Sequence, residues 1–143
     1  MSAQSYSNHR RYVTGYHVVL FGLIVATLVG ASVNLYRSWG ESGFYSASLI
    51  VALTLATLGC CAYMRLFALK AQDRAIRAEE NLRHYALTGR LLDPRLTIRQ
   101  IIGLRFAADA EFLDLAASAA AQGTSEDDIK KAIRSWRPDT YRV

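Results

Sequence analysis

The feature that most constrains this chain is an uncharged apolar run that continues into a charged segment without a helix breaker. Residues 44–64 are 21 residues without a charge, and charged residues become frequent from Arg65 onward. Between residues 44 and 88 there is no proline, and the only glycine is Gly59. A helix of these 45 residues would extend about 68 Å, and about 20 residues are enough to cross a bilayer. We therefore predict a membrane span over 44–64 that continues as a projecting cytoplasmic helix over 65–90.

A second apolar run precedes this one, and a short polar connection separates the two. Residues 13–36 are apolar over a length sufficient for another span. The connection over 37–43 contains two glycines, which suits a tight turn between antiparallel helices. The sequence therefore predicts an all-α membrane protein built on a two-helix transmembrane hairpin. Its parts are an N-terminal tail (1–11), the hairpin (12–64, with spans at about 13–36 and 44–64), the projecting helix (65–90) and a small cytoplasmic helical domain (91–143).

Basic residues are distributed unevenly around the two spans, and this asymmetry predicts their orientation. Residues 65–105 carry nine Lys/Arg and four Asp/Glu, whereas 106–143 carry five and seven. Because cytoplasmic flanks are enriched in Lys and Arg, we expect both termini in the cytoplasm. Anionic head groups of the lipid bilayer would attract the basic flanks, while the acidic distal part argues against nucleic acid as a partner. The candidate membrane-surface residues are Arg10, Arg11, Arg65, Lys70 and Arg74.

Small residues recur every four positions in both predicted spans. Steps of four keep such a set along one helix face, where small side chains let two backbones approach closely. The two stripes could pack against each other within the hairpin, or each could face a neighbouring subunit. The candidate helix-packing residues are Gly22, Ala26, Gly30, Asn34, Ser48, Ala52, Ala56 and Cys60.

The projecting helix carries one narrow apolar stripe, which we call the seam. Its steps of three and four residues are typical of a helix that packs along one side. The opposite-charge pairs Asp73–Arg77 and Glu79–Arg83 also favour helix here. Because the stripe is short and rich in alanine, we expect it to pack on the chain's own last helices or on a partner rather than to form a coiled coil alone. The seam consists of Ala71, Ala75, Ala78, Leu82 and Tyr85.

Start and stop signals divide the distal part into short helices. Gly89 is placed to end the projecting helix, and Thr97 with Gln100 fits a capping box. Asp109 is expected to cap a second helix, and Ser125 a third whose first turn is acidic. We therefore predict three short helices packed on the projecting one. The predicted core is Leu82, Ile98, Ile101, Leu104, Phe112, Leu115, Ile129, Ile133 and Trp136.

The sequence contains few residues in patterns typical of catalytic or metal-binding sites. No HExxH, CxxC, P-loop, GxSxG or Rossmann pattern occurs, and no two of the three histidines stand at metal-ligand spacing. We therefore expect no catalytic residue, no metal and no cofactor. His17 is the one ionisable group at membrane depth, and its nearness to the interface favours an interfacial hydrogen bond over a proton site. Asn34 is expected to bond across the hairpin. Whether Cys60 and Cys61 serve more than packing is left open.

Two stretches carry a family resemblance: LLDPRLTIRQIIGLRF over 91–106 and DIKKAIRSWRPDTYRV over 128–143. Together they resemble a family of small uncharacterised bacterial two-span membrane proteins, the domain of unknown function 6526. The resemblance implies a two-span hairpin with a cytoplasmic helical end in the bacterial inner membrane. It implies no catalytic or binding residue.

Three classes of function compete for such a chain. An enzyme would need a nucleophile, an acid–base pair or a metal cluster, and the sequence lacks them. An oligomeric pore or a transport-associated protein would need polar groups at membrane depth, where only His17 and Asn34 come near. The remaining class is a non-catalytic subunit or adaptor of a membrane protein assembly, either a homo-oligomer or a larger complex. We expect this third class.

Overall fold

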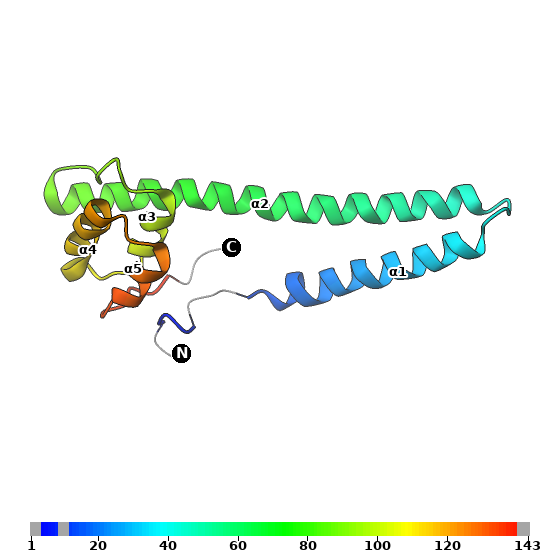
Figure 1. The fold of residues 1–143 in the computed structure, drawn as a ribbon, viewed down its shortest axis with the longest axis horizontal. Coiled ribbons are helices and arrows are strands. Elements are labelled where there is room, and N and C mark those ends of the chain that lie inside the picture. The colour runs from blue at the N-terminus through cyan, green and yellow to red at the C-terminus, as the bar shows by residue number, and fades with distance from the viewer. Residues whose placement is uncertain (1–3, 9–11, 140–143) are drawn as a thin grey trace. The chain divides into compact units, whose positions relative to one another are not determined.

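The computed structural model describes residues 4–8 and 12–139, and every regular element within them is helical (Figure 1). Residues 12–67 form one compact unit, here called the apolar unit. Residues 68–139 form the other together with residues 4–8, and we call the part of it that follows α2, residues 89–139, the helical module. The elements are η1 (Gly15–Leu20), α1 (Phe21–Arg37), α2 (Phe44–Thr88), α3 (Ile98–Leu104), α4 (Asp109–Gln122) and α5 (Glu126–Ala132).

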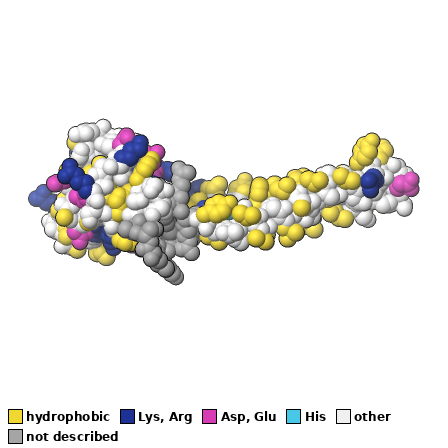
Figure 2. All heavy atoms as spheres, turned by 90° about the horizontal axis from the view of Figure 1, so that it is seen from below, with side chains coloured by type: hydrophobic (Ala, Val, Ile, Leu, Met, Phe, Trp, Pro, Cys, Tyr) yellow, Lys and Arg dark blue, Asp and Glu magenta, His cyan; other side chains and the backbone are white. Residues whose placement is uncertain are grey.

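The apolar unit contains two helices that are long and apolar enough to cross a membrane. The first covers Gly15–Arg37 with a mean hydropathy of 2.3, and the second is α2, with 1.9 over its apolar window. Only 11% of either window is buried, whereas the core helix of a soluble protein would be mostly buried. Figure 2 shows yellow hydrophobic side chains over the face of these helices that it presents. Helices of the predicted length therefore occupy both predicted spans.

α2 is one uninterrupted helix, as the absence of breakers predicts. It begins at Phe44 and ends at Thr88, and its residues belong to both units. Gly89 follows with a φ of 71°, in the left-handed region that glycine tolerates. Its amide donates to the carbonyl of Tyr85 at 2.7 Å, which closes the last turn.

The first helix begins with a turn that the sequence did not predict. Gly15–Leu20 is π-helical, a wider turn than the α-helix that follows it. Within this region the Tyr16 hydroxyl donates to the carbonyl of Cys61 at 2.7 Å. That bond joins the start of the first helix to a point far along α2, so the two helices approach each other there.

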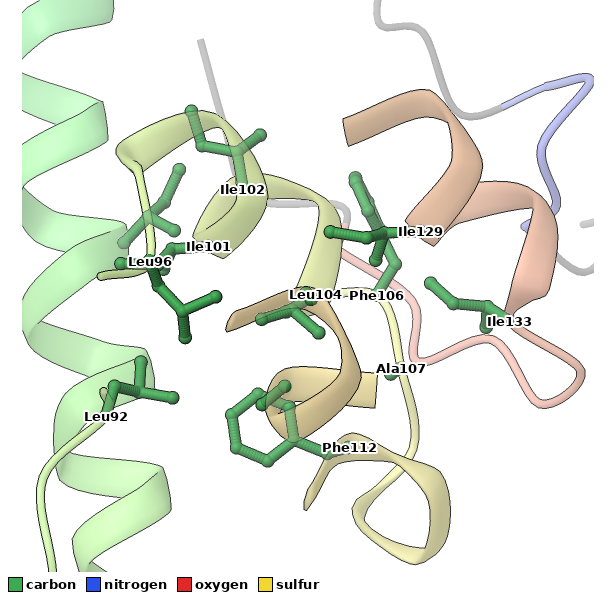
Figure 3. Packing of buried hydrophobic residues seen from close by; sticks show 13 residues of the cluster. Leu92, Leu96, Ile101, Ile102, Leu104, Phe106, Ala107, Phe112, Ile129 and Ile133 are labelled. Atoms are coloured by element: carbon green, nitrogen blue, oxygen red, sulfur yellow. The ribbon is translucent and has the colours of Figure 1, made fainter. Parts of the chain in front are cut away.

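The helical module has one apolar core, built by α3, α4, α5, the segments around them and Ile76 of α2 (Figure 3). Leu104, Phe106, Phe112 and Ile129 are its largest fully buried side chains. All the predicted core residues belong to this cluster or pack against it, with the exception of Leu82. The core also includes residues not predicted for it: Ile76, Leu92, Leu96, Ile102, Phe106, Ala107, Ala116 and Ala119.

The predicted capping box at the start of α3 is present and also joins two helices. The Thr97 hydroxyl accepts from the Gln100 amide, while the Gln100 side chain accepts from the Thr97 amide at 2.9 Å. The Gln100 side-chain NH₂ then donates to the carbonyls of Ala119 at 3.1 Å and Thr124 at 2.9 Å. This buried amide therefore holds α3 against the end of α4 and leaves no donor unpaired.

α3 and α5 cross at very short distance, and Gly103 makes this possible. A Cβ atom at position 103 would lie 3.1 Å from the Glu126 carbonyl oxygen and 3.3 Å from Cγ2 of Ile129. Both distances are tighter than ordinary contacts, so a side chain larger than hydrogen would force the helices apart. The apolar unit has no comparable site, because its Gly15, Gly22, Gly30 and Gly59 have nothing within 4 Å of such an atom.

One predicted detail of the helical module is wrong: Asp109 does not cap α4, since Ala108 is the N-cap and Asp109 is already helical. α5 ends at Ala132, and Trp136 contacts the core from beyond this helix, where it forms a bridge with Ala107. That bridge is fixed when the Arg137 amide donates to the Phe106 carbonyl at 2.7 Å.

Residues 4–8 of the predicted N-terminal tail form a turn and contact the helical module. Ser5 donates through its amide to the Asn8 side chain at 2.6 Å, which closes a turn. The Gln4 side-chain oxygen accepts from the Asp139 amide at 2.7 Å. Residues before the first apolar helix therefore contact residues that follow α5.

Candidate functional site

The seam of α2 does not face the helical module, contrary to one of the two predicted arrangements. All five of its residues are exposed, Leu82 by 67% and Tyr85 by 54%. The helical module instead packs on Ile76, Glu80 and Arg83. These three follow steps of four and three residues and lie on the opposite side of the helix. Leu82 is absent from the core for this reason.

A network of charges occupies the buried side of α2. Arg83 donates through Nη1 to Glu80 Oε2 at 3.0 Å and through Nε to Asp109 Oδ1 at 2.7 Å. Its Nη2 donates to the carbonyl of Ala107 at 2.7 Å, and the guanidinium carbon lies 4.1 Å from the centre of the Phe112 ring. Glu80 is only 4% exposed. Arg83 therefore joins α2 to the start of α4 by contacts that a lysine could not reproduce.

This network borders an open depression of about 430 Å³, lined by Arg83, Ala108, Asp109 and Arg137. Arg137 lies 3.8 Å from the second oxygen of Glu80. Two cations thus face two carboxylates, and the charges balance. A site for an anionic ligand would need a surplus of positive charge or free donors. The contacts of Arg83 instead give the cluster a structural role, holding the helical module on α2.

The described residues contain no group of three His, Cys, Asp or Glu side chains that could hold a metal ion. Cys60 and Cys61 are free thiols. The His84 Nδ1 lies 2.7 Å from the Arg90 carbonyl, where it helps to close the chain after α2. The Thr88 hydroxyl lies 3.2 Å from the same Nδ1 atom and donates to the His84 carbonyl at 2.7 Å, so these contacts belong to the end of α2.

His17 makes its contacts close to the start of the first helix. Its Nδ1 is 3.0 Å from the Val13 carbonyl oxygen, and its ring stacks on Tyr12 with centroids 4.7 Å apart. The interfacial role of His17 stays a prediction. Asn34 differs from the prediction, because it is exposed and makes no hydrogen bond across to α2 within the described part of the chain. His9 lies outside the described residues.

The two stripes of small residues do not pack against each other. Gly22, Ala26, Gly30 and Asn34 are exposed on α1, whereas its buried residues are Ile24 and Ala31. The packing within the apolar unit therefore uses a different face from the one predicted. Contact with a neighbouring subunit, the other alternative, stays a prediction. On α2 the predicted Ser48 is partly buried, while Ala52, Ala56 and Cys60 are exposed.

The described membrane-surface candidates lie on α2. Arg65 is partly buried, with its guanidinium carbon 5.8 Å from the centre of the Tyr16 ring. Lys70 and Arg74 are exposed and, at four-residue spacing, share one helix face. Arg10 and Arg11 lie outside the described residues.

The comparisons with known proteins give a family but no activity. No curated protein matches the chain, and no solved structure matches it. One family covers the whole sequence, residues 1–143, and its function is unknown. The predicted resemblance is thereby confirmed: the chain belongs to the family of unknown function DUF6526.

Proposed function

We propose that this protein is a non-catalytic integral membrane protein that serves as a subunit or adaptor of a membrane protein assembly in the bacterial inner membrane. The observation that carries the proposal is the continuity of α2. One helix holds an apolar window of spanning length and also contributes Ile76 to the core of the helical module. Such a helix would fix a folded cytoplasmic module to the bilayer without a flexible linker.

The contact between Gln4 and Asp139 supports two crossings with both ends on one side. The two residues are joined by a hydrogen bond of 2.7 Å, although both long apolar helices lie between them in the sequence. Two residues can form a direct hydrogen bond only if they lie on the same side of the membrane, so the chain between them must cross the membrane an even number of times. The basic residues after the second span then place that side in the cytoplasm.

The outer surfaces support an adaptor role better than the pore alternative. His17 bonds within its own helix, and the exposed Asn34 stands only three residues before Arg37 at the end of α1. Neither side chain is placed to line a polar path at mid-membrane depth. The exposed seam and the exposed small residues of α1 and α2, by contrast, are surfaces that another protein could cover.

Site-directed labelling tests the topology. In a Cys60→Ser, Cys61→Ser background, Glu41→Cys should react with a membrane-impermeant maleimide from outside the cell. Arg90→Cys, also at an exposed position, should react only after the membrane is opened. Labelling of both positions from the same side would refute the topology.

Purification tests the assembly. The full chain, extracted in a mild detergent from its native host, should run as a particle heavier than one copy, and mass spectrometry should identify its constituents. A particle made of a single copy and no other protein would contradict the proposal. Extraction from membranes by alkaline carbonate would also contradict it, because that treatment leaves spanning proteins in place.

A further inference from the structure

We propose that the seam of α2 is a homodimer interface, at which two copies of this chain form a short parallel coiled coil just outside the membrane. The inference rests on the proposed membrane topology for its orientation. It adds to the proposed function the identity of one partner and the surface that binds it.

The spacing of the exposed residues is that of a coiled coil. Successive steps of four, three, four and three residues place Ala75 and Leu82 seven residues apart, and Ala71, Ala78 and Tyr85 likewise. These two sets are the a and d positions of a heptad repeat, which face a partner helix in a two-stranded coil. Leu82 and Tyr85 are 67% and 54% exposed, so the single chain leaves this face uncovered.

The charges beside the seam are complementary between two copies. With Ala75 at position a, Arg74 is at g and Glu79 at the e position of the following heptad. In a parallel coiled coil, g of one helix lies beside the next e of its partner, and opposite charges there select partner and direction. Two equivalent Arg74–Glu79 pairs would form between the copies. An antiparallel pair would instead bring g against g and e against e, which loses both contacts.

Both charged residues are available for these pairs. Arg74 and Glu79 are exposed, and neither forms an ion pair within the described part of the chain. The neighbouring Glu80 and Arg83 are already occupied by each other, 3.0 Å apart on the buried side of α2. The charged residues that contact the chain's own helical module therefore lie on one side of α2, and Arg74 and Glu79 remain exposed for contact with a second copy.

The membrane explains why so short an interface would suffice. Alanine-rich a and d positions bury little area, and a seam of only about two heptads would associate weakly in free solution. Two copies inserted with the same topology already have parallel helices and share a thin layer, which raises their effective concentration. The membrane would therefore supply the orientation that the charge pattern selects.

Cross-linking in membranes tests the interface. In a Cys60→Ser, Cys61→Ser background, Ala78→Cys places two thiols across the seam, and copper-catalysed oxidation should give a covalent dimer. Arg77→Cys, next to it but outside the seam, is the control and should give little. A disulfide requires the two Cα atoms to come within about 7 Å, so the seams of the two copies must face each other at this position. Equal cross-linking at both positions, or none at position 78, would overturn the proposal.

Charge reversal tests the pairing. Measured by energy transfer between labelled copies in phosphatidylcholine vesicles, Arg74→Glu and Glu79→Arg should each weaken association about tenfold. The double variant should recover most of it, while Arg77→Glu makes the same charge change outside the seam and should leave it unchanged. Loss in the double variant equal to the sum of the single losses would contradict the pairing.

A seam variant separates association from folding. Leu82→Glu should abolish dimerisation but leave the unfolding of the helical module unaltered, because the leucine contributes nothing to the core. If the chain resists carbonate extraction and co-purifies with other proteins but without a second copy, the homodimer is refuted and the adaptor role survives. If carbonate releases the chain, the proposed function fails, whatever the seam binds.

Discussion

The two compact units of this chain use apolar side chains in opposite ways. In the helical module Phe106 and Phe112 are completely buried, and a single small core joins the short helices. In the apolar unit Leu23 is 63% and Leu53 is 69% exposed, and long side chains cover the outside of both helices. The side chains of a core must fit the shapes of their neighbours. A helix that spans a bilayer needs only apolar side chains and sufficient length.

Polar side chains also form different hydrogen bonds in the two units. In the apolar unit the hydroxyls of Thr27, Ser32, Thr54 and Thr57 each donate to a carbonyl four residues earlier in their own helix, at 2.8 Å. Such bonds satisfy a hydroxyl without water or a partner helix. In the other unit, Gln100 of the helical module and Arg83 of α2 reach carbonyls 19 and 24 residues away. Long-range polar contacts therefore give the helical module a specific arrangement, and the following substitutions test that difference.

The largest effect is expected from Arg83→Ala. It removes the nearer cationic partner of the buried Glu80, leaving Arg137 at 3.8 Å, and the link to Asp109 and Ala107. Removing one partner of a buried ion pair costs about 3–5 kcal/mol. We expect the free energy of unfolding of the helical module to fall by that amount. Urea titration in micelles, followed by Trp136 fluorescence in a Trp39→Phe background, measures it.

Arg77→Ala is the matched control for this change. Arg77 is exposed on the same helix and forms no ion pair within the described residues. Its loss should change the free energy of unfolding by less than about 0.5 kcal/mol. If both variants were equally stable, the Arg83 network would be an exposed surface cluster and the inferred role in holding the helical module would be wrong.

The same glycine substitution should act differently in the two units. Gly103→Ala puts a Cβ atom 3.1 Å from the Glu126 carbonyl, and overpacking of this kind costs about 1–3 kcal/mol. Gly30→Ala meets nothing within 4 Å and removes a flexible residue from a helix, so the isolated chain should be unchanged or slightly more stable. Thermal unfolding in micelles compares the two. A loss of assembly on Gly30→Ala, with folding intact, would instead indicate that this stripe of α1 faces a neighbour.

A smaller effect is expected at the start of α3. Thr97→Ala removes the hydroxyl that accepts from the Gln100 amide and should cost about 1 kcal/mol. Thr97→Ser keeps the hydroxyl and should cost little. Urea titration of both variants measures the change in the free energy of unfolding. Equal decreases in the two variants would show that the Thr97 methyl group, rather than the cap, stabilises the helix.

Local signals made the helices predictable. The absence of breakers between 44 and 88 gives α2 its observed bounds, and Gly89, Thr97 and Ser125 mark helix ends that the structure confirms. Each of these signals acts within one turn of helix, so the residues themselves contain the information. The family resemblance added no bound that these signals had not already given.

Side-chain orientation was not predictable in the same way. The apolar seam made the inward face of α2 look obvious, yet the helical module packs on Ile76, Glu80 and Arg83. That face is set by contacts of Arg83 with Asp109, 26 residues later in the chain, and with the carbonyl of Ala107, which lies beyond the end of α3. A four-residue rule pairs Arg83 with Glu79, whereas the structure pairs it with Glu80 because Asp109 and Phe112 draw the guanidinium inward. Tertiary contact overrides local spacing here.

The smallest expected effect lies in the turn before α3, at Asp93. The Arg95 side chain donates to this carboxylate at 2.7 Å, and the Arg95 amide donates to it at 2.9 Å. These hydrogen bonds lower the pKa of Asp93 from its ordinary value of 3.8 to about 2, and the side-chain bond from Arg95 has the larger effect.

A carboxyl group whose pKa is lower in the folded chain stabilises the fold above its unfolded pKa. Its contribution is therefore present above about pH 4 and disappears as the pH falls towards 2. Arg95 is exposed and Asp93 is partly exposed, so salt should weaken the pair and the change in stability should be slight. Carbon-13 NMR of the aspartate carboxyl in micelles should give a pKa near 2, and Arg95→Gln should raise that pKa towards 3.8. An unchanged pKa in Arg95→Gln would mean that the turn itself, and not the arginine, stabilises the charged form.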